Sequence, residues 1–166
     1  MGIIAPKKGT VLSSALIILL LIGLSPILIF AVFLYFLWGV ILYLTIWLRL
    51  TSKKPFVIFV YSDSPTWKDY IEAEILPFIQ NRAVILNWSE RRNWKNSLAV
   101  LAFRYFSGFR NFNPIAMIFW PFRLVKPYRF FEAFQRFKRG DRQKVEEIKT
   151  ELFESLGIGN TSVHSF

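Results

Sequence analysis

The sequence predicts a membrane-anchored α/β protein, and three features of the chain lead to this prediction. No charged residue occurs in the 40 positions from Gly9 to Leu48. Beyond them, residues 55–157 alternate short apolar runs with segments of helical periodicity, a pattern typical of a sheet covered by helices. A short basic connection with Arg49 and Lys53 joins the two parts. We therefore expect four regions, namely a basic flank at 1–10, a membrane segment at 11–50, an α/β domain at 55–157 and a flexible tail at 158–166.

The composition excludes several classes of chemistry. The chain has 166 residues, 54% of them hydrophobic, with a net charge of +10, one histidine and no cysteine. A disordered protein is excluded, because disorder requires low hydrophobicity. Without cysteine the chain forms no disulfides, no Cys-bound metal centre and no dithiol redox couple. We therefore expect neither a cofactor nor a metal site.

The uncharged run is too long for the buried helix of a soluble domain and predicts an integral membrane segment. As one straight helix, residues 11–48 would measure about 57 Å, whereas the hydrocarbon core of a bilayer is about 30 Å thick. Gly23, Ser25 and Pro26 interrupt the run, and a proline inside a helix removes a backbone donor. We expect a helical hairpin bent near residues 23–26, and a single kinked span is the alternative.

Charge favours the hairpin, because both ends of the run are basic. Lys7 and Lys8 precede it, and the positive-inside tendency keeps basic flanks in the cytoplasm. The α/β domain is then cytoplasmic, and a bacterial inner membrane fits a cysteine-free anchor flanked by Lys and Arg. In the second half of the run, Tyr35, Tyr43 and Trp47 are expected anchors at the membrane interface.

The first half of the α/β domain is expected to contain two strands around a helix. Residues 55–61 form a continuous apolar run, which is typical of a strand buried on both faces. Ser64 and Pro65 suit the N-cap and the first position of a helix that extends to Gln80. Residues 83–87 are the second strand.

The second half is expected to contain two helices and two strands. Asn93 caps the first of these helices. Residues 114–120 form a third strand, with residues 123–131 as an edge partner. Asp141 caps the last helix, which ends at Gly157. The alternation of strands and helices argues for a partly parallel sheet.

This β-α-β-α-β-β-α order resembles the thioredoxin fold, and three local motifs strengthen the resemblance. The sequence SPTW at 64–67 follows the first strand, where the thioredoxin family carries Cys-x-x-Cys. Pro77 lies within the following helix pattern, as a helix proline does in thioredoxins. The Asn113-Pro114 step is similar to the cis-proline that leads into the third strand of that family. The alternative is an unrelated small α/β sandwich.

The departure from the family motif carries a functional implication. Ser64 and Trp67 occupy the two thiol positions, so the resemblance implies a redox-inactive domain. The resemblance still implies the family's other function, the binding of an extended peptide by strand-like pairing in a cleft beside the cis-proline, here Pro114.

Residues 103–139 interleave 13 aromatic with eight basic side chains. One interpretation is a domain core covered by a solvated basic face. The second is a surface that contacts anionic lipid or a partner subunit. A third, binding of single-stranded nucleic acid, is not expected, because no RNA-binding motif accompanies the pattern. The basic residues of this predicted surface are Arg104, Arg110, Arg123, Lys126, Arg129, Arg136, Lys138 and Arg139.

Three functions compete. The first is a non-enzymatic integral membrane protein that stabilises or assembles a larger membrane protein complex, with membrane lipids and other membrane subunits as partners. The second is a membrane-bound enzyme that acts on a lipid or phosphorylated substrate, with Asp63, Ser64, Asn87 or Glu90 near its site. The third is an adaptor that binds lipid surfaces or peptides through residues 103–139.

Overall fold

The computed structural model describes residues 8–50, 55–108 and 113–158. Most of the predicted basic flank and tail, together with Arg110, lie outside the described residues. The chain forms two compact units, Met1–Ile41 and Leu42–Phe166. The described part is mixed α/β with one long apolar N-terminal helix, which confirms the predicted fold class at that level.

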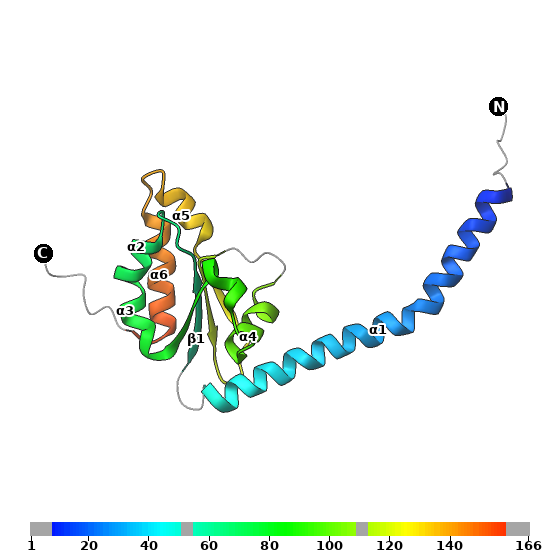
Figure 1. Ribbon diagram of the computed structural model, residues 1–166, viewed down its shortest axis with the longest axis horizontal. Helices are drawn as coiled ribbons and strands as arrows, with labels where there is room; N and C mark the ends of the chain where they lie inside the picture. Colours follow the sequence, from blue (N-terminus) through cyan, green and yellow to red (C-terminus); the bar gives the residue numbers. More distant parts are fainter. Residues whose placement is uncertain (1–7, 51–54, 109–112, 159–166) are drawn as a thin grey trace, which may run out of the picture. The chain divides into compact units, whose positions relative to one another are not determined.

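Helix α1 (Lys8–Leu50) is a single helix of 43 residues, so the predicted hairpin is wrong. Its direction changes along its length but does not reverse (Figure 1). Pro26 cannot donate to the carbonyl oxygen of Ile22, and the hydroxyl group of Ser25 donates to that oxygen instead, at 2.8 Å. Because the freed acceptor is satisfied within the helix, the proline is accommodated without breaking it.

The α/β domain is built on a four-stranded mixed sheet in the order β2-β1-β3-β4. Its strands are β1 (Phe56–Tyr61), β2 (Ala83–Asn87), β3 (Ile115–Phe119) and β4 (Lys126–Arg129). Strand β1 runs parallel to β2, with Phe59 opposite Ile85, and antiparallel to β3, with Phe59 opposite Ala116. Strand β3 is also antiparallel to β4. All four predicted strands are present.

One face of the sheet is covered by four helices. These are α2 (Lys68–Glu74), α3 (Leu76–Ile79), α5 (Phe131–Phe137) and α6 (Gln143–Ser155). Alternate side chains of β1, including Phe59, point into this layer, because successive residues of a strand face opposite sides. They pack with Ile71, Phe134 and Leu152, all fully buried.

The opposite face is covered by α4 (Leu98–Phe106) and by the last turns of α1. The other set of β1 side chains, including Ile58, packs here with Phe103 of α4. Ile46 of α1 is only 1% exposed in the same core cluster. The sheet is thus the middle of three layers, with α4 on one side and α2, α3 and α6 on the other (Figure 1).

Several predicted helix boundaries are corrected. Helix α2 begins at Lys68, after a turn in which the Ser64 carbonyl oxygen accepts from the Lys68 N–H at 3.0 Å. The predicted helix to Gln80 is interrupted at Ile75, since Pro77 offers no N–H to the preceding turn. Helix α5 was not predicted at all, and it replaces the end of the expected edge strand.

Two further starts differ from the predicted ones. Asn93 ends a short 3-10 helix (Trp88–Asn93), and α4 is capped by Ser97, whose hydroxyl oxygen accepts from the Val100 N–H at 3.3 Å. The N-cap position of α6 is Arg142 and not the predicted Asp141, although the Asp141 side chain accepts from the Gln143 N–H at 3.1 Å. Gly157 ends α6 with a φ of +63°, as predicted for a helix stop.

Candidate functional site

Four polar side chains meet where β1 and β2 end. Asp63 follows β1 and forms an ion pair of 2.8 Å with Lys68 through Oδ1. Its other carboxylate oxygen, Oδ2, accepts from the side-chain amide of Asn87 at 3.0 Å. Ser89 accepts from the Asp63 N–H at 3.0 Å and donates its own N–H to Asn87 at 2.9 Å. We call these residues, Asp63, Lys68, Asn87 and Ser89, the Asp63 cluster.

Hydrogen bonds within the Asp63 cluster favour the charged forms of Asp63 and Lys68. The hydrogen bond from Lys68, followed by that from Asn87, lowers the pKa of the Asp63 carboxyl group. The same bond to Asp63 raises the pKa of Lys68. Both groups are therefore charged near neutral pH. A carboxylate with a lowered pKa and a partner on each oxygen is a poor general base.

Trp67 and Ser64, the two positions predicted to correspond to the thiols of the thioredoxin motif, have structural contacts. Trp67 is 8% exposed, and its indole N–H donates to the Ser62 carbonyl oxygen at 3.2 Å. Its ring lies 5.9 Å from that of Phe134, measured between centroids. The Ser64 hydroxyl oxygen accepts from the Thr66 N–H at 3.4 Å. Ser64 thus supports the turn after β1, and Trp67 belongs to the core.

Pro114 lies at the same end of the sheet as the Asp63 cluster, because β3 starts where its antiparallel neighbour β1 ends. The Asn113–Pro114 peptide bond is cis. The Ser62 hydroxyl group donates to the Asn113 side-chain oxygen at 3.1 Å. The Pro114 carbonyl oxygen accepts from the Phe130 N–H at 2.9 Å, which connects the starts of β3 and α5.

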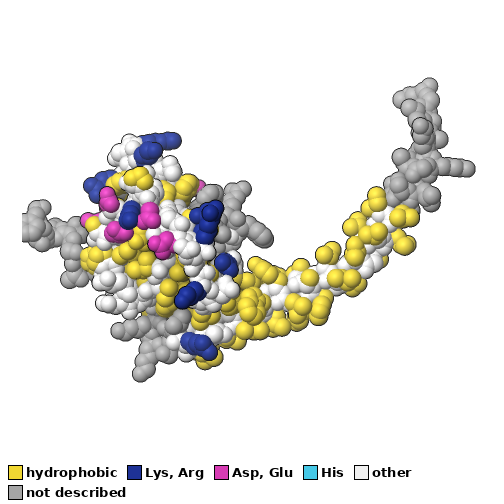
Figure 2. Space-filling view, viewed as in Figure 1, with side chains coloured by type: hydrophobic (Ala, Val, Ile, Leu, Met, Phe, Trp, Pro, Cys, Tyr) yellow, Lys and Arg dark blue, Asp and Glu magenta, His cyan; other side chains and the backbone are white. Residues whose placement is uncertain are grey.

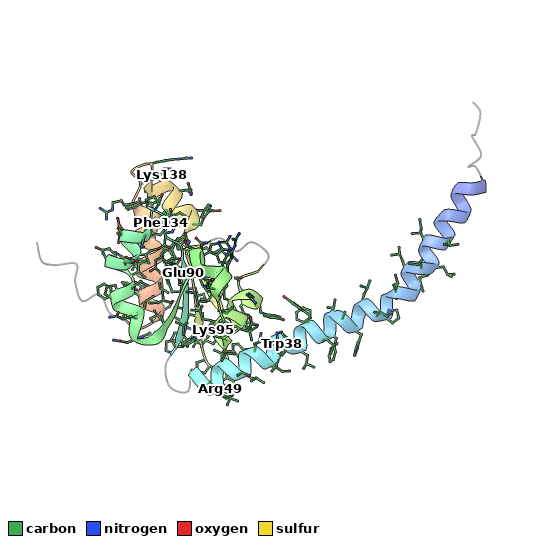
Figure 3. All side chains as sticks on the ribbon, in the orientation of Figure 1. Trp38, Arg49, Glu90, Lys95, Phe134 and Lys138 are labelled. Carbon is green, nitrogen blue, oxygen red and sulfur yellow. The ribbon has the colours of Figure 1, made fainter. Side chains whose placement is uncertain are left out.

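The predicted basic surface is spread over the domain. Arg123 precedes β4 in the turn after β3, Lys126 opens β4 and Arg129 closes it, so Lys126 and Arg129 lie at opposite ends of that strand. On the face shown in Figure 2, Lys and Arg form several separate groups. Figure 3 labels Lys138 and Arg49 at opposite ends of the domain.

Individual basic side chains have distinct contacts. Arg129 donates to the carbonyl oxygen of the buried Ser107 at 3.0 Å, at the end of α4. Arg104 donates to the Asn96 side chain at 3.3 Å. Three further residues of the predicted basic surface are exposed at or near the end of α5, namely Arg136, Lys138 and Arg139.

The predicted membrane anchors separate into two kinds. Tyr35 is exposed on α1, in the first unit. The Tyr43 hydroxyl group lies 2.5 Å from the Trp120 carbonyl oxygen and 2.6 Å from that of Arg123, and it accepts from the Arg123 N–H at 3.1 Å. The Trp47 ring lies 4.5 Å from that of Phe122, between centroids.

These contacts reveal a feature that sequence reasoning missed. Residues 120–125 connect β3 to β4, and we call them the β3–β4 turn. The end of α1 holds this turn from Tyr43 and Trp47, so the last turns of the apolar run are part of the α/β domain. The available signal was the spacing of Tyr43 and Trp47, which places both on one helix face.

No protein-family model, curated protein or solved structure matches this chain. Within the described ranges, no three His, Asp or Glu side chains are grouped so that they could hold a metal ion.

Proposed function

We propose that this chain is a non-enzymatic integral membrane protein that stabilises or assembles a larger membrane protein complex. The observation that carries the proposal is the exposure of α1. From Leu16 to Ile41, every described large apolar side chain is at least 42% exposed. At 1.5 Å per residue this segment is about 39 Å long, enough to cross a hydrocarbon core of about 30 Å.

The kind of side chain exposed on α1 supports protein partners in addition to lipid. Phe30, Phe33, Phe36 and Trp38 are all about half exposed or more. Aromatic side chains are enriched in protein interfaces relative to the rest of protein surfaces. A neighbouring membrane helix would cover these rings, and that is the role expected of an accessory subunit.

The α/β domain is proposed to be a redox-inactive, thioredoxin-like domain. Its support is the β-α-β-α-β-β-α order, with a β3 strand that runs antiparallel to both of its neighbours. Ser64 and Trp67 stand in the turn after β1, in place of the family's thiols. In such a domain, the region beside Pro114 would hold an extended segment of a partner.

A single span puts the two ends of α1 on opposite sides of the membrane. Lys7 and Lys8 precede the span, whereas Arg49, Lys53 and Lys54 follow it. The larger number of basic residues on the domain side favours a cytoplasmic domain by the positive-inside rule. The proposed location is a bacterial inner membrane, which suits a cysteine-free chain with an anchor flanked by Lys and Arg.

Affinity purification of the full tagged chain from native membranes in mild detergent tests the assembly role. We expect one or more membrane proteins to co-purify in fixed stoichiometry. The matched control replaces residues 16–41 by a leucine-rich span of equal length, which keeps the anchor but removes the aromatic side chains. Loss of the partners in the control assigns their binding to α1. A chain that elutes alone would overturn the proposal.

A second candidate is a membrane-bound enzyme acting on a lipid or phosphorylated substrate. Its support is the position of the Asp63 cluster, since ligands of α/β proteins bind at the carboxyl ends of strands. The occupied oxygens of Asp63 count against it. An Asp63→Asn chain that keeps the full cellular phenotype would exclude a role for this carboxylate.

A further inference from the structure

We infer that the β3–β4 turn inserts into an anionic lipid interface and thereby fixes the α/β domain on the membrane surface. This inference rests on the proposed membrane span of α1. Phe122 is 81% exposed and Leu124 is 93% exposed, the highest values among the large apolar side chains that the structure describes. Single exposed apolar residues are common on proteins, but two at the tip of one turn form a local apolar surface.

The turn lies beside the segment of α1 that would leave the bilayer. Ile41 is 47% exposed, whereas Leu42 and Ile46 are 3% and 1% exposed within the domain. On the side of α1 that carries Leu42 and Ile46, the lipid-facing surface therefore ends just before Leu42, whereas Leu44 and Leu48 on the other side stay exposed. Tyr43 and Trp47 follow, and Tyr and Trp are the residues that concentrate at the boundary between hydrocarbon and headgroups.

Tyr43 and Trp47 also contact the β3–β4 turn, which places the turn at the level of this boundary. The Tyr43 hydroxyl group contacts the backbone on both sides of Phe122, at Trp120 and Arg123. The Trp47 ring lies against the Phe122 ring. The exposed tip is thus continuous with the end of the membrane helix, and the lipid headgroup region is the surface that it would meet.

The backbone of the turn supports a function for its exposed tip. Phe122 has a φ of 56°, in the left-handed region that bulky side chains rarely adopt. The residue nevertheless remains mostly exposed, so burial in the domain does not explain this conformation. Unfavourable backbone conformations are concentrated at functional positions such as ligand clamps.

Charge selects anionic lipid as the occupant. Arg123 and Lys126 are exposed and adjoin the apolar tip in the sequence, and Arg49, two residues after Trp47, is also exposed. The sequence contains no Asp or Glu before Asp63 and none between Glu90 and Glu132. Each basic side chain near an anionic surface is attracted to it, while Phe and Leu enter the acyl boundary.

This arrangement orients the sheet. Strand β1 starts at the membrane end and ends at the Asp63 cluster, and its 6 residues span about 20 Å at 3.3 Å per residue. Pro114 lies at that distal end. A segment bound beside Pro114 would therefore come from a partner protein that projects beyond the headgroups.

The test uses the full chain, which contains no cysteine. Leu124→Cys is labelled with an environment-sensitive fluorophore and reconstituted in vesicles of equal parts phosphatidylcholine and phosphatidylglycerol. Lys138→Cys, exposed at the end of α5, is the matched control. With a quencher attached to lipid near the headgroups, we expect several-fold stronger quenching at position 124 than at 138. Adding Arg123→Glu and Lys126→Glu should reduce the quenching at 124.

Each outcome decides between clear alternatives. A chain that alkaline extraction removes from the vesicles would overturn the span and this inference together. A chain that stays in the membrane with equal, weak quenching at both positions would overturn only the inference. A probe at 124 that is shielded from water but not quenched by lipid would assign the turn to contact between copies of the chain, against the lipid proposal. Since purified vesicles hold no partner complex, none of these outcomes depends on the assembly role.

Discussion

The hydroxyl group of Tyr43 lies 2.5 Å from the carbonyl oxygen of Trp120, a residue 77 positions later in the chain. Tyr43 belongs to an apolar run that looks purely like a membrane segment, whereas Trp120 follows a central strand of the α/β domain. The bond shows that the last turns of α1 are a structural part of that domain.

Removing the buried contact of α1 should destabilise the domain. Ile46→Ala deletes a side chain that is 1% exposed, and such core truncations lower the free energy of unfolding by about 2–5 kcal/mol. Leu48→Ala, at a position 68% exposed, is the control and should change it by less than about 0.5 kcal/mol. Denaturant titration of the full chain in detergent micelles measures both. Equal effects would contradict the packing of Ile46.

Removing the Tyr43 hydroxyl group should loosen the β3–β4 turn. Tyr43→Phe deletes the closer acceptor of the Arg123 N–H, which also lies 3.5 Å from the Trp120 carbonyl oxygen, and the one hydroxyl proton that the carbonyl oxygens of Trp120 and Arg123 share. A lost hydrogen bond of this kind costs about 0.5–1.5 kcal/mol. Hydrogen exchange should therefore be faster at the Arg123 amide, and the amides of β1 should be unchanged. An unchanged rate at Arg123 would refute the bond.

Trp67 and Ser64, two residues of the turn after β1, should respond very differently to truncation. Trp67→Ala removes a buried ring beside Phe134 and should lower the free energy of unfolding by about 3–5 kcal/mol. Ser64→Ala loses one long hydrogen bond from Thr66 and should cost less than about 1 kcal/mol. Urea denaturation followed by tyrosine and tryptophan fluorescence compares them. A large effect at Ser64 would point to a function beyond the turn.

Stability should fall at alkaline pH. Burial, then the hydrogen bond to Glu72, raises the pKa of Tyr61 to about 12. Burial, then the hydrogen bond to Glu146, raises the pKa of Tyr70 to about 12. In the unfolded chain a tyrosine ionises near pH 10. The stabilising effect of the neutral tyrosines is thus complete below about pH 10 and is lost as the pH rises towards 12.

This dependence is checked by measuring the denaturation midpoint of the full chain between about pH 8 and about pH 12, on either side of the pKa of about 10 that a tyrosine has in the unfolded chain. A chain with Tyr61→Phe and Tyr70→Phe should show a shallower decline over the same interval. If the denaturation midpoint stays constant or increases at pH values above about 10, the raised pKa values of Tyr61 and Tyr70 are contradicted.

A single span should place the two ends of α1 on opposite sides of the membrane. Thr10→Cys and Lys138→Cys, each in the cysteine-free background, report the two ends without other thiols. In sealed cells, a membrane-impermeant thiol reagent should label position 10 from outside, and position 138 only after permeabilisation. Protection of both positions in sealed cells would contradict a single span.

Parts of the fold followed from local sequence alone. The six residues of β1 are continuously apolar, and a strand covered on both faces produces that pattern. The apolar length of α1 likewise predicted a membrane segment. Helix α5 was missed because its aromatic residues also suit a strand. Packing of Phe130 and Phe134 against the core, at helical spacing, decided its conformation.

The candidate site was likewise predictable from the sequence only in part. Asp63 follows β1 and Asn87 is the last residue of the parallel strand β2, so their place at one end of the sheet could be foreseen. The pairing of Asp63 with Lys68 and Asn87 could not. The sequence did not indicate that Lys126 and Arg129 lie at opposite ends of β4, and their role in a lipid or partner surface stays a prediction.

The sequence by itself determined that an apolar helix precedes an α/β domain, since composition and periodicity over neighbouring residues suffice for both. Only the tertiary structure decided that the helix passes Pro26 unbroken, through the Ser25 bond to Ile22, and that its end supports the β3–β4 turn. The latter contact joins residues far apart in the chain, and the strand order that brings them together leaves no trace in local periodicity.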